Sequence, residues 1–164
     1  MGAAYLGVPC AVKNRPALDA AYLPFAPWRD AYLKEAHRPV RIAVERQDGQ
    51  VAVFDTRLRG VTDPADLRFL ERIVKLLLWS VGGWRVRICG CDALPRRLAE
   101  IYGPHGSRAF DASLMETVFR RPFTLESVAE RDFPAARSGA RVSLPQPGCP
   151  LTASFLRIFI KIHQ

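Results

Sequence analysis

The chain of 164 residues lacks the short motifs by which catalytic and metal-binding proteins are usually recognised. It has no Gly-x-Ser-x-Gly nucleophile turn, no glycine-rich phosphate cradle and no catalytic Cys/His signature. Its four cysteines, Cys10, Cys89, Cys91 and Cys149, form no CxxC pair, and two thiolates around Gly90 are too few ligands for zinc. We therefore predict free thiols, no metal, no cofactor and no nucleophilic catalysis.

Long apolar runs are missing as well. No 18-residue apolar segment could cross a bilayer, and no basic start followed by an apolar run marks a leader peptide. Because the cysteines also form no disulfide framework, we expect a cytoplasmic protein without a transmembrane segment. A chain of this length buries roughly 70% of its unfolded surface, which is enough for one globular domain.

Lysine is scarce: only four of the 24 basic residues are Lys and 20 are Arg, with a net charge of +8. The basic residues form no run longer than pairs such as Arg96-Arg97 and Arg120-Arg121. An anionic partner such as nucleic acid would explain the excess, and so would the arginine bias of a GC-rich coding sequence.

Three regions follow from the composition. Residues 1–38 mix prolines with aromatic residues, so we predict an irregular arm packed on the domain, with a short helix over 29–36. Residues 39–132 are predicted to form a single α/β domain. Residues 133–164 contain no Asp or Glu, and we expect a poorly structured tail.

The first half of the domain reads as a hairpin, a helix and a strand. Alternating apolar residues predict strands over 40–45 and 51–59, joined by the turn Asp48-Gly49. Asp63 should cap a helix that starts at Pro64 and ends at Gly82-Gly83. Its apolar stripe is Leu67, Leu70, Ile73, Val74, Leu77 and Leu78, and its wet face is Arg68, Glu71, Arg72 and Lys75. Residues 84–88 predict a strand parallel to one hairpin strand.

The second half adds two helices and a strand. One helix is predicted over 95–102 and ends at Gly103-Pro104. Asp111 should cap the next helix, with Phe110 and Met115 as a hydrophobic staple, and Pro122 should end it at about Arg121. Residues 123–128 predict a fourth strand. The order predicts an α/β fold in which a β-hairpin and β-α-β crossover units form a mixed sheet with helices packed on it.

One face of this sheet is predicted to be polar, because arginines alternate with apolar residues on three strands. These residues are Arg41, Arg57, Arg59, Arg85 and Arg87. Three interpretations are open for this face: contact with water, docking of another domain, or binding of a nucleic acid or phosphate.

Two segments of the domain resemble a known family. They are Arg41 to Arg59 and Phe69-Leu-Glu-Arg-Ile-Val-Lys-Leu-Leu-Leu-Trp-Ser-Val-Gly-Gly-Trp-Arg-Val-Arg-Ile-Cys-Gly90. The resemblance continues through Tyr102-Gly-Pro-His-Gly-Ser-Arg-Ala-Phe-Asp111 and spans about Tyr5 to Arg137. This overall pattern resembles the N-terminal region that precedes the kinase-like half in some bacterial members of the repressor/open-reading-frame/kinase (ROK) family.

The resemblance implies an accessory or regulatory domain without its catalytic half, which would be the partner. Kinases of this family have an actin-like, RNase-H-like fold and phosphorylate sugars with MgATP, so a degenerate half of that fold is one form the domain could take. None of the family's functional residues can be carried over. The Asp-x-Gly-Gly-Thr phosphate loop is replaced by Glu45-Arg46-Gln47-Asp48-Gly49, and the family's zinc motif fails after Cys91.

We therefore expect no enzymatic activity from this chain alone, whereas its parent would be an ATP-dependent sugar kinase. A truncation or frameshift near Arg137 would account for the acid-free tail. The alternative function is a small basic module that binds nucleic acid or phosphate through the arginine-rich face.

Overall fold

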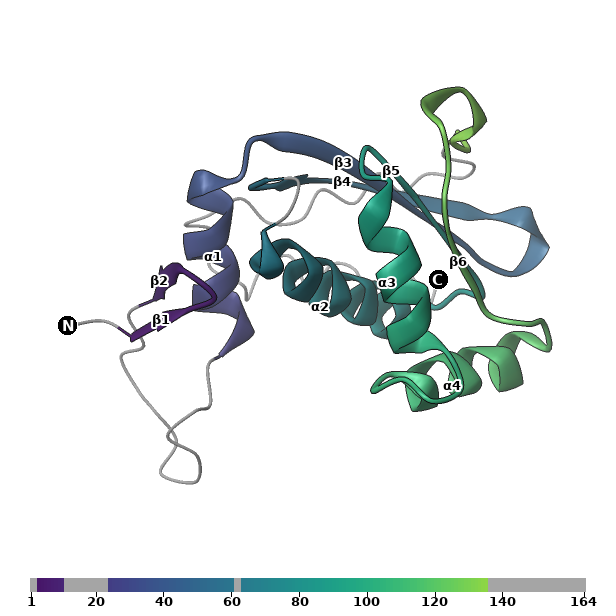
Figure 1. Ribbon diagram of the computed structural model, residues 1–164. Helices are drawn as coiled ribbons and strands as arrows, with labels where there is room; N and C mark the ends of the chain where they lie inside the picture. The colour runs from purple at the N-terminus through teal and green to yellow at the C-terminus, as the bar shows by residue number, and fades with distance from the viewer. Residues whose placement is uncertain (1–2, 11–23, 61–62, 136–164) are drawn as a thin grey trace, which may run out of the picture.

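The computed structural model describes residues 3–10, 24–60 and 63–135 of the chain. Within these residues four helices pack against a mixed four-stranded sheet, which confirms the predicted α/β class (Figure 1). The sheet order is β4-β3-β5-β6, and only the pair β5 and β6 is parallel. The predicted relation to the RNase-H-like fold stays a prediction.

The hairpin consists of β3 (Arg38–Glu45) and β4 (Val51–Leu58), as the alternation predicts. Gly49 in the connecting turn has a φ of 70°, a left-handed conformation that glycine adopts without a steric penalty. Ile42 and Phe54 are opposite each other in the register and point into the core. Ala43 and Val53 are also paired, and they lie on the other face in a smaller apolar cluster.

Helix α2 (Pro64–Val81) is the central helix of the core, and both of its predicted ends are confirmed. Asp63 accepts a hydrogen bond from the amide of Ala65, and Gly82 ends the helix with a φ of 68°. The predicted apolar stripe is buried except for Leu67, which is half-buried. The wet face is predicted wrongly at Glu71, which is buried because residues following the next helix cover it.

Strand β5 (Arg85–Cys89) follows α2 and pairs antiparallel with β3. It therefore runs in the same direction as β4, as the crossover predicts, but β3 lies between the two strands. The connection from β4 through α2 to β5 thus passes over one strand of the sheet. As a result β3 and β5 are the two central strands, and Val86 and Ile88 are fully buried.

Helices α3 (Ala93–Tyr102) and α4 (Ala109–Phe119) connect β5 to β6 (Thr124–Ser127), which is the predicted parallel crossover. The predicted start of the last helix is wrong, whereas its end agrees to within two residues with the prediction of about Arg121. Arg108 is its N-cap residue, Asp111 lies inside the first turn, and Arg120 ends it in a left-handed conformation. The staple is wrong too, because Phe110 points to solvent whereas Met115 is buried.

The N-terminal arm has more regular structure in its described part than its composition predicts. Strands β1 (Ala3–Tyr5) and β2 (Val8–Cys10) form a small hairpin, and α1 (Phe25–Glu35) begins before the predicted helix. Pro27 is tolerated because it lies in the first helical turn, where its missing N–H has no partner to lose. Trp28 of α1 is buried in the core and donates a hydrogen bond to the carbonyl of Tyr5 at 3.1 Å, which joins the small hairpin to α1.

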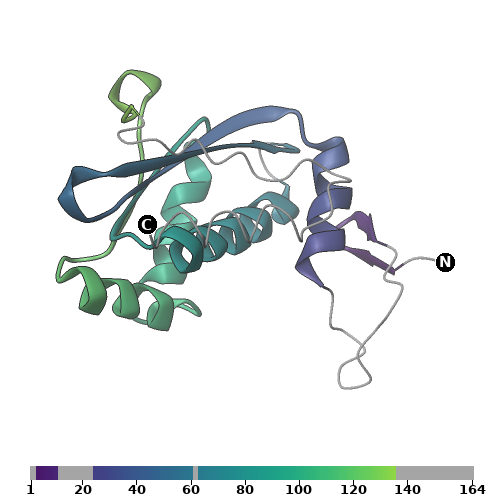
Figure 2. The ribbon, with the colours of Figure 1, turned by 180° about the vertical axis from the view of Figure 1, so that it is seen from behind.

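The layers are arranged asymmetrically. Helices α2, α3 and α4 lie on the same side of the sheet in both views, and α4 is the helix farthest from it (Figures 1 and 2). The core lies between these helices and the inner face of the sheet. In the part of the chain that the structure describes, no helix is long and apolar enough to cross a bilayer.

Candidate functional site

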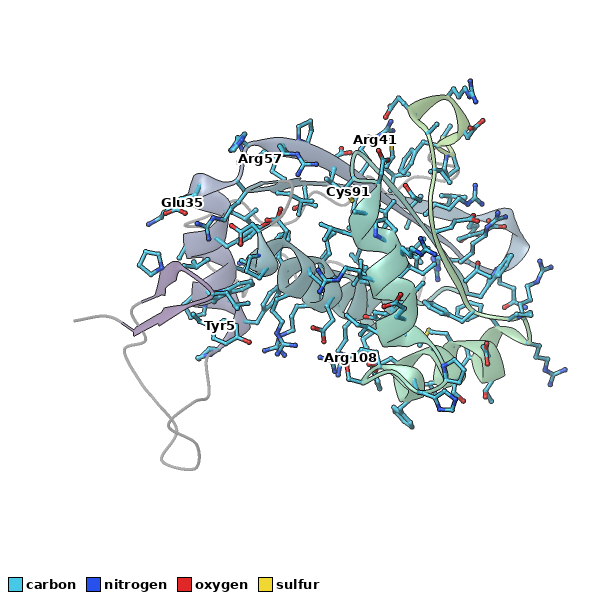
Figure 3. All side chains as sticks on the ribbon, viewed as in Figure 1. Tyr5, Glu35, Arg41, Arg57, Cys91 and Arg108 are labelled. Atoms are coloured by element: carbon cyan, nitrogen blue, oxygen red, sulfur yellow. The ribbon has the colours of Figure 1, made fainter. Side chains whose placement is uncertain are left out.

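The predicted arginine-rich face is the outer face of the sheet, on the side away from the helices. Strand register places Arg41, Arg85 and Arg87 among residues of this face: Arg41 is opposite Asp55 and Cys89, and Arg87 is opposite Ala43. Arg57 lies on the same face near the end of the edge strand β4. Figure 3 shows Arg41 and Arg57 on this side, and Arg108 on the opposite side of the molecule.

Arg59 belongs to a different cluster, although the alternation groups it with the other four arginines. It lies in the bend after β4, where its guanidinium forms ion pairs with Glu35 of α1 at 2.8 Å and with Asp63 at 3.4 Å. The structure therefore brings four of the five predicted residues to one face. The strand ends at Leu58, which is why the alternation no longer fixes the side on which Arg59 lies.

Carboxylates pair with three of the four outer-face arginines. Arg85 contacts Glu126 at 2.7 Å, and Arg87 contacts both Glu45 and Glu126. Arg41 contacts Asp55 at 3.6 Å and also Glu130. The four arginines, Arg57 included, and the four carboxylates Glu45, Asp55, Glu126 and Glu130 carry no net formal charge.

Arg57 is the exception among the described residues, since it is exposed and forms no hydrogen bond or ion pair with them. Sequence reasoning missed the neutralisation of the face. Glu45 and Asp55 share the strand alternation with the arginines and could have been found. Glu126 and Glu130 come from the far end of the fold, and only the sheet order brings them here.

The centre of the outer face is apolar and is covered by the segment that follows β6. Ala43, Val51 and Val53 are buried against Phe133. The guanidinium carbon of Arg41 lies 4.2 Å from the centroid of the Phe133 ring, within the range of a cation–π contact. The outer face thus combines a small apolar centre with a surrounding network of ion pairs.

Cys89 and Cys91 are free thiols, as predicted, and both are buried. Cys89 lies on the outer face and donates a hydrogen bond to Glu130 at 3.0 Å. Burial and this hydrogen bond raise the pKa of the Cys89 thiol, while the same bond and Arg41 lower the pKa of Glu130. Cys91 belongs to the main core, where burial raises its pKa to about 11. Neither thiol is activated as a nucleophile.

A second polar cluster lies on the helix side of the molecule, and no pattern in the sequence predicts it. Glu71 of α2 accepts hydrogen bonds from Arg68 at 2.6 Å and from Arg108 at 2.8 Å. Asp111 of α4 accepts a hydrogen bond from the indole of Trp79 at 2.7 Å. These bonds fix the loop between α3 and α4 on α2, so we assign them a structural role.

Groups that could hold a metal ion are not assembled in the described regions. No set of three or more His, Cys, Asp or Glu side chains lies close enough together there to bind a metal ion. Comparison with family models, curated proteins and solved structures finds no match to this chain. The resemblance to the ROK family therefore stays a prediction, and the outer face of the sheet is the best-supported candidate site.

Proposed function

We propose that this chain is a non-catalytic accessory or regulatory domain of a ROK-like, sugar-kinase-type protein, and that it docks on a catalytic domain through the outer face of its sheet. The observation that carries the proposal is the one-sided sheet: the helices cover the inner face only (Figure 1). A sheet of this kind has a second face available for another layer of structure.

The chemistry of the outer face favours a protein partner over a polyanion. Phosphate binding depends on cations that are free to replace counterions, whereas Arg41, Arg85 and Arg87 are already paired with carboxylates. Phe133 already covers the small apolar centre, so a partner domain would meet mainly the surrounding network of ion pairs, and interfaces between domains of one chain are often polar in this way. We place the protein in the cytoplasm, in agreement with its free thiols.

The docking proposal is tested with the catalytic half of a bacterial ROK-family sugar kinase whose N-terminal region shows the same pattern. Binding to the purified chain is measured by titration calorimetry. Arg57→Glu should weaken it, because among the described residues Arg57 is the cation of this face whose side chain has no ion pair. Arg97→Glu, on the exposed side of α3, makes the same charge change elsewhere and should not weaken binding. Equal weakening by both variants, or no binding at all, argues against docking through this face.

The non-catalytic part of the proposal has its own test. The purified chain alone should neither bind ATP nor hydrolyse it in the presence of glucose or N-acetylmannosamine. Sugar-dependent ATP turnover that survives repurification would disprove it. Salt-sensitive binding of DNA that Arg57→Glu abolishes would instead support the alternative function, a phosphate-binding face.

A further inference from the structure

Helix α4 presents an apolar strip to solvent on the side of the molecule opposite the proposed docking face. Phe110, Leu114 and Val118 are spaced at i, i+4 and i+8, so they follow one side of the helix over about 12 Å. The side chains of Phe110 and Val118 are 71% and 61% exposed, and Leu114 is half-buried. Leu114 packs against the core, so the exposed apolar groups of the strip are Phe110 and Val118 at its two ends. Single apolar residues scattered over a surface are ordinary, whereas several large ones gathered on one side of a helix indicate an interaction site.

Trp79 extends this strip from the neighbouring helix. It is 52% exposed, and its indole N–H is held by Asp111, which lies in the first turn of α4 next to Phe110. The hydrogen bond satisfies the polar edge of the indole and leaves much of the ring facing solvent. An aromatic side chain fixed in this way can enter an apolar environment with little further loss of conformational freedom.

Cations lie at both ends of the strip. Lys75 and Arg108 are near its start, where each lies 3.8 Å from Asp111, and Arg120 and Arg121 follow its end. Asp111 and Glu71 are themselves buried, with 6% and 7% of their side chains exposed, so the positive charges are nearer to solvent than the negative ones. The exposed Glu116 accepts a hydrogen bond from the amide of Phe123.

We propose that this α4 surface, made of Trp79, Phe110, Leu114 and Val118 with the exposed cations Arg120 and Arg121, binds the surface of a lipid bilayer that contains anionic phospholipids. Apolar side chains on a protruding helix would enter the boundary between headgroups and acyl chains, and the cations would contact the phosphates. Because α4 lies farthest from the sheet, the outer face would stay free in the bound state (Figure 2).

Two other occupants fit the surface less well. A second copy of the chain, packed antiparallel along α4, would bring Arg108 of one copy against Arg120 and Arg121 of the other, which is electrostatically unfavourable. Single-stranded nucleic acid would match the cations, but Leu114 and Val118 are aliphatic and offer no flat ring on which a base could stack. Charge and side-chain type together favour the anionic bilayer.

The proposal is tested by co-sedimentation of the full chain with vesicles. Binding is expected to an equimolar mixture of phosphatidylcholine and phosphatidylglycerol, and not to pure phosphatidylcholine. Phe110→Ser combined with Val118→Ser should weaken binding roughly tenfold by removing apolar contact area. Arg121→Gln should weaken it roughly fivefold. Arg131→Gln removes an exposed charge in the segment after β6, which lies away from α4 (Figure 1), and is the matched control, expected to bind as the unchanged chain does.

Melting curves and far-UV circular dichroism of each variant show that the fold is intact, as the exposure of the substituted side chains predicts. Three results overturn the proposal: no binding to either vesicle, binding that the double variant leaves unchanged, or equal loss by Arg131→Gln and Arg121→Gln. The proposal also fails if sedimentation velocity shows a dimer of the unchanged chain that the double variant does not form. It fails as well if the unchanged chain binds a single-stranded oligonucleotide and the double variant does not. None of these results depends on docking to a kinase domain.

Discussion

Asp66 is the side chain whose removal should destabilise this fold most directly through lost hydrogen bonds. Its carboxylate is fully buried and accepts three bonds: from the hydroxyl of Tyr32 at 2.5 Å, and from the amides of Arg59 and Gly60, each at 3.1 Å. It therefore joins α1, the end of β4 and the first turn of α2. Asp66→Ala leaves all three donors without this acceptor.

The size of the effect follows from these contacts. A buried donor without a partner costs about 1–3 kcal/mol, and the Tyr32 hydroxyl and the two amides are only partly accessible to water. We expect Asp66→Ala to lower the free energy of unfolding by about 3–5 kcal/mol. Tyr32→Phe removes the bond to Asp66 and the longer bond that the Tyr32 hydroxyl accepts from the amide of Arg59 at 3.3 Å, and should cost about 1–2 kcal/mol. The double variant should lose less than the sum by about 1 kcal/mol, because the two changes share a bond.

The measurement is urea unfolding followed by circular dichroism, with linear extrapolation to water. Asp132→Ala is the control, because Asp132 is exposed and pairs only with the neighbouring Arg131 among the described residues; its change should stay within about 0.5 kcal/mol. An Asp66→Ala variant as stable as the Asp132→Ala variant would refute the assignment of Asp66 as the link between the three elements, and strictly additive effects would refute its bond to Tyr32.

Three further predictions use other parts of the fold. Leu77→Ala should cost about 2–5 kcal/mol in urea melts because Leu77 is buried in the core, whereas Arg72→Ala on the outer side of α2 should cost less than about 1 kcal/mol; equal costs would mean that the helix faces are wrongly assigned. Gly90→Ala should lower the Tm far more than Gly49→Ala. Both glycines have a positive φ, but only at Gly90 would a Cβ lie 2.6 Å from a backbone carbonyl oxygen, that of Pro39. Similar decreases in Tm for the two variants would contradict this steric argument. Burial raises the pKa of the Cys91 thiol to about 11, so the thiol loses its proton at a lower pH in the unfolded state than in the folded state. The Tm should therefore fall as the pH rises from about 9 to about 11. Cys91→Ala should reduce that fall, and an unchanged fall in this variant would refute the role of the thiol.

Local patterns predicted the elements of the fold well. The alternation in the hairpin and the Asp63 cap act over a few residues, so their outcome does not depend on the rest of the chain. Burial of Glu71 could not be predicted in this way, because the helical pattern makes it part of a wet face until the loop carrying Arg108 covers it. The predicted hydrophobic staple at Phe110 was wrong for a related reason. The staple requires α4 to begin just after Asp111, whereas α4 begins earlier, at Ala109.

The candidate site was predicted as a set of positions but not as an electrostatic environment. The strand alternation identified Arg41, Arg57, Arg85 and Arg87 as sharing a face. Their charge depends on Glu126 and Glu130, which are 41 residues from Arg85 and 89 from Arg41 along the chain. Whether an arginine is free or paired is decided by strand order, which alternation along a single strand does not contain.

The position of β6 has a consequence for hydrogen exchange and for the charge of the molecule in its partly open forms. β6 is the shortest strand of the main sheet, lies at its edge and has no fully buried residue, so it should belong to the cooperative unit that opens at the lowest free energy. Glu126 lies in this strand and Glu130 follows it. Opening this unit would therefore remove carboxylate partners from Arg41, Arg85 and Arg87 together, and the fraction of molecules with a cationic outer face should equal the fraction in which the amides of β6 exchange.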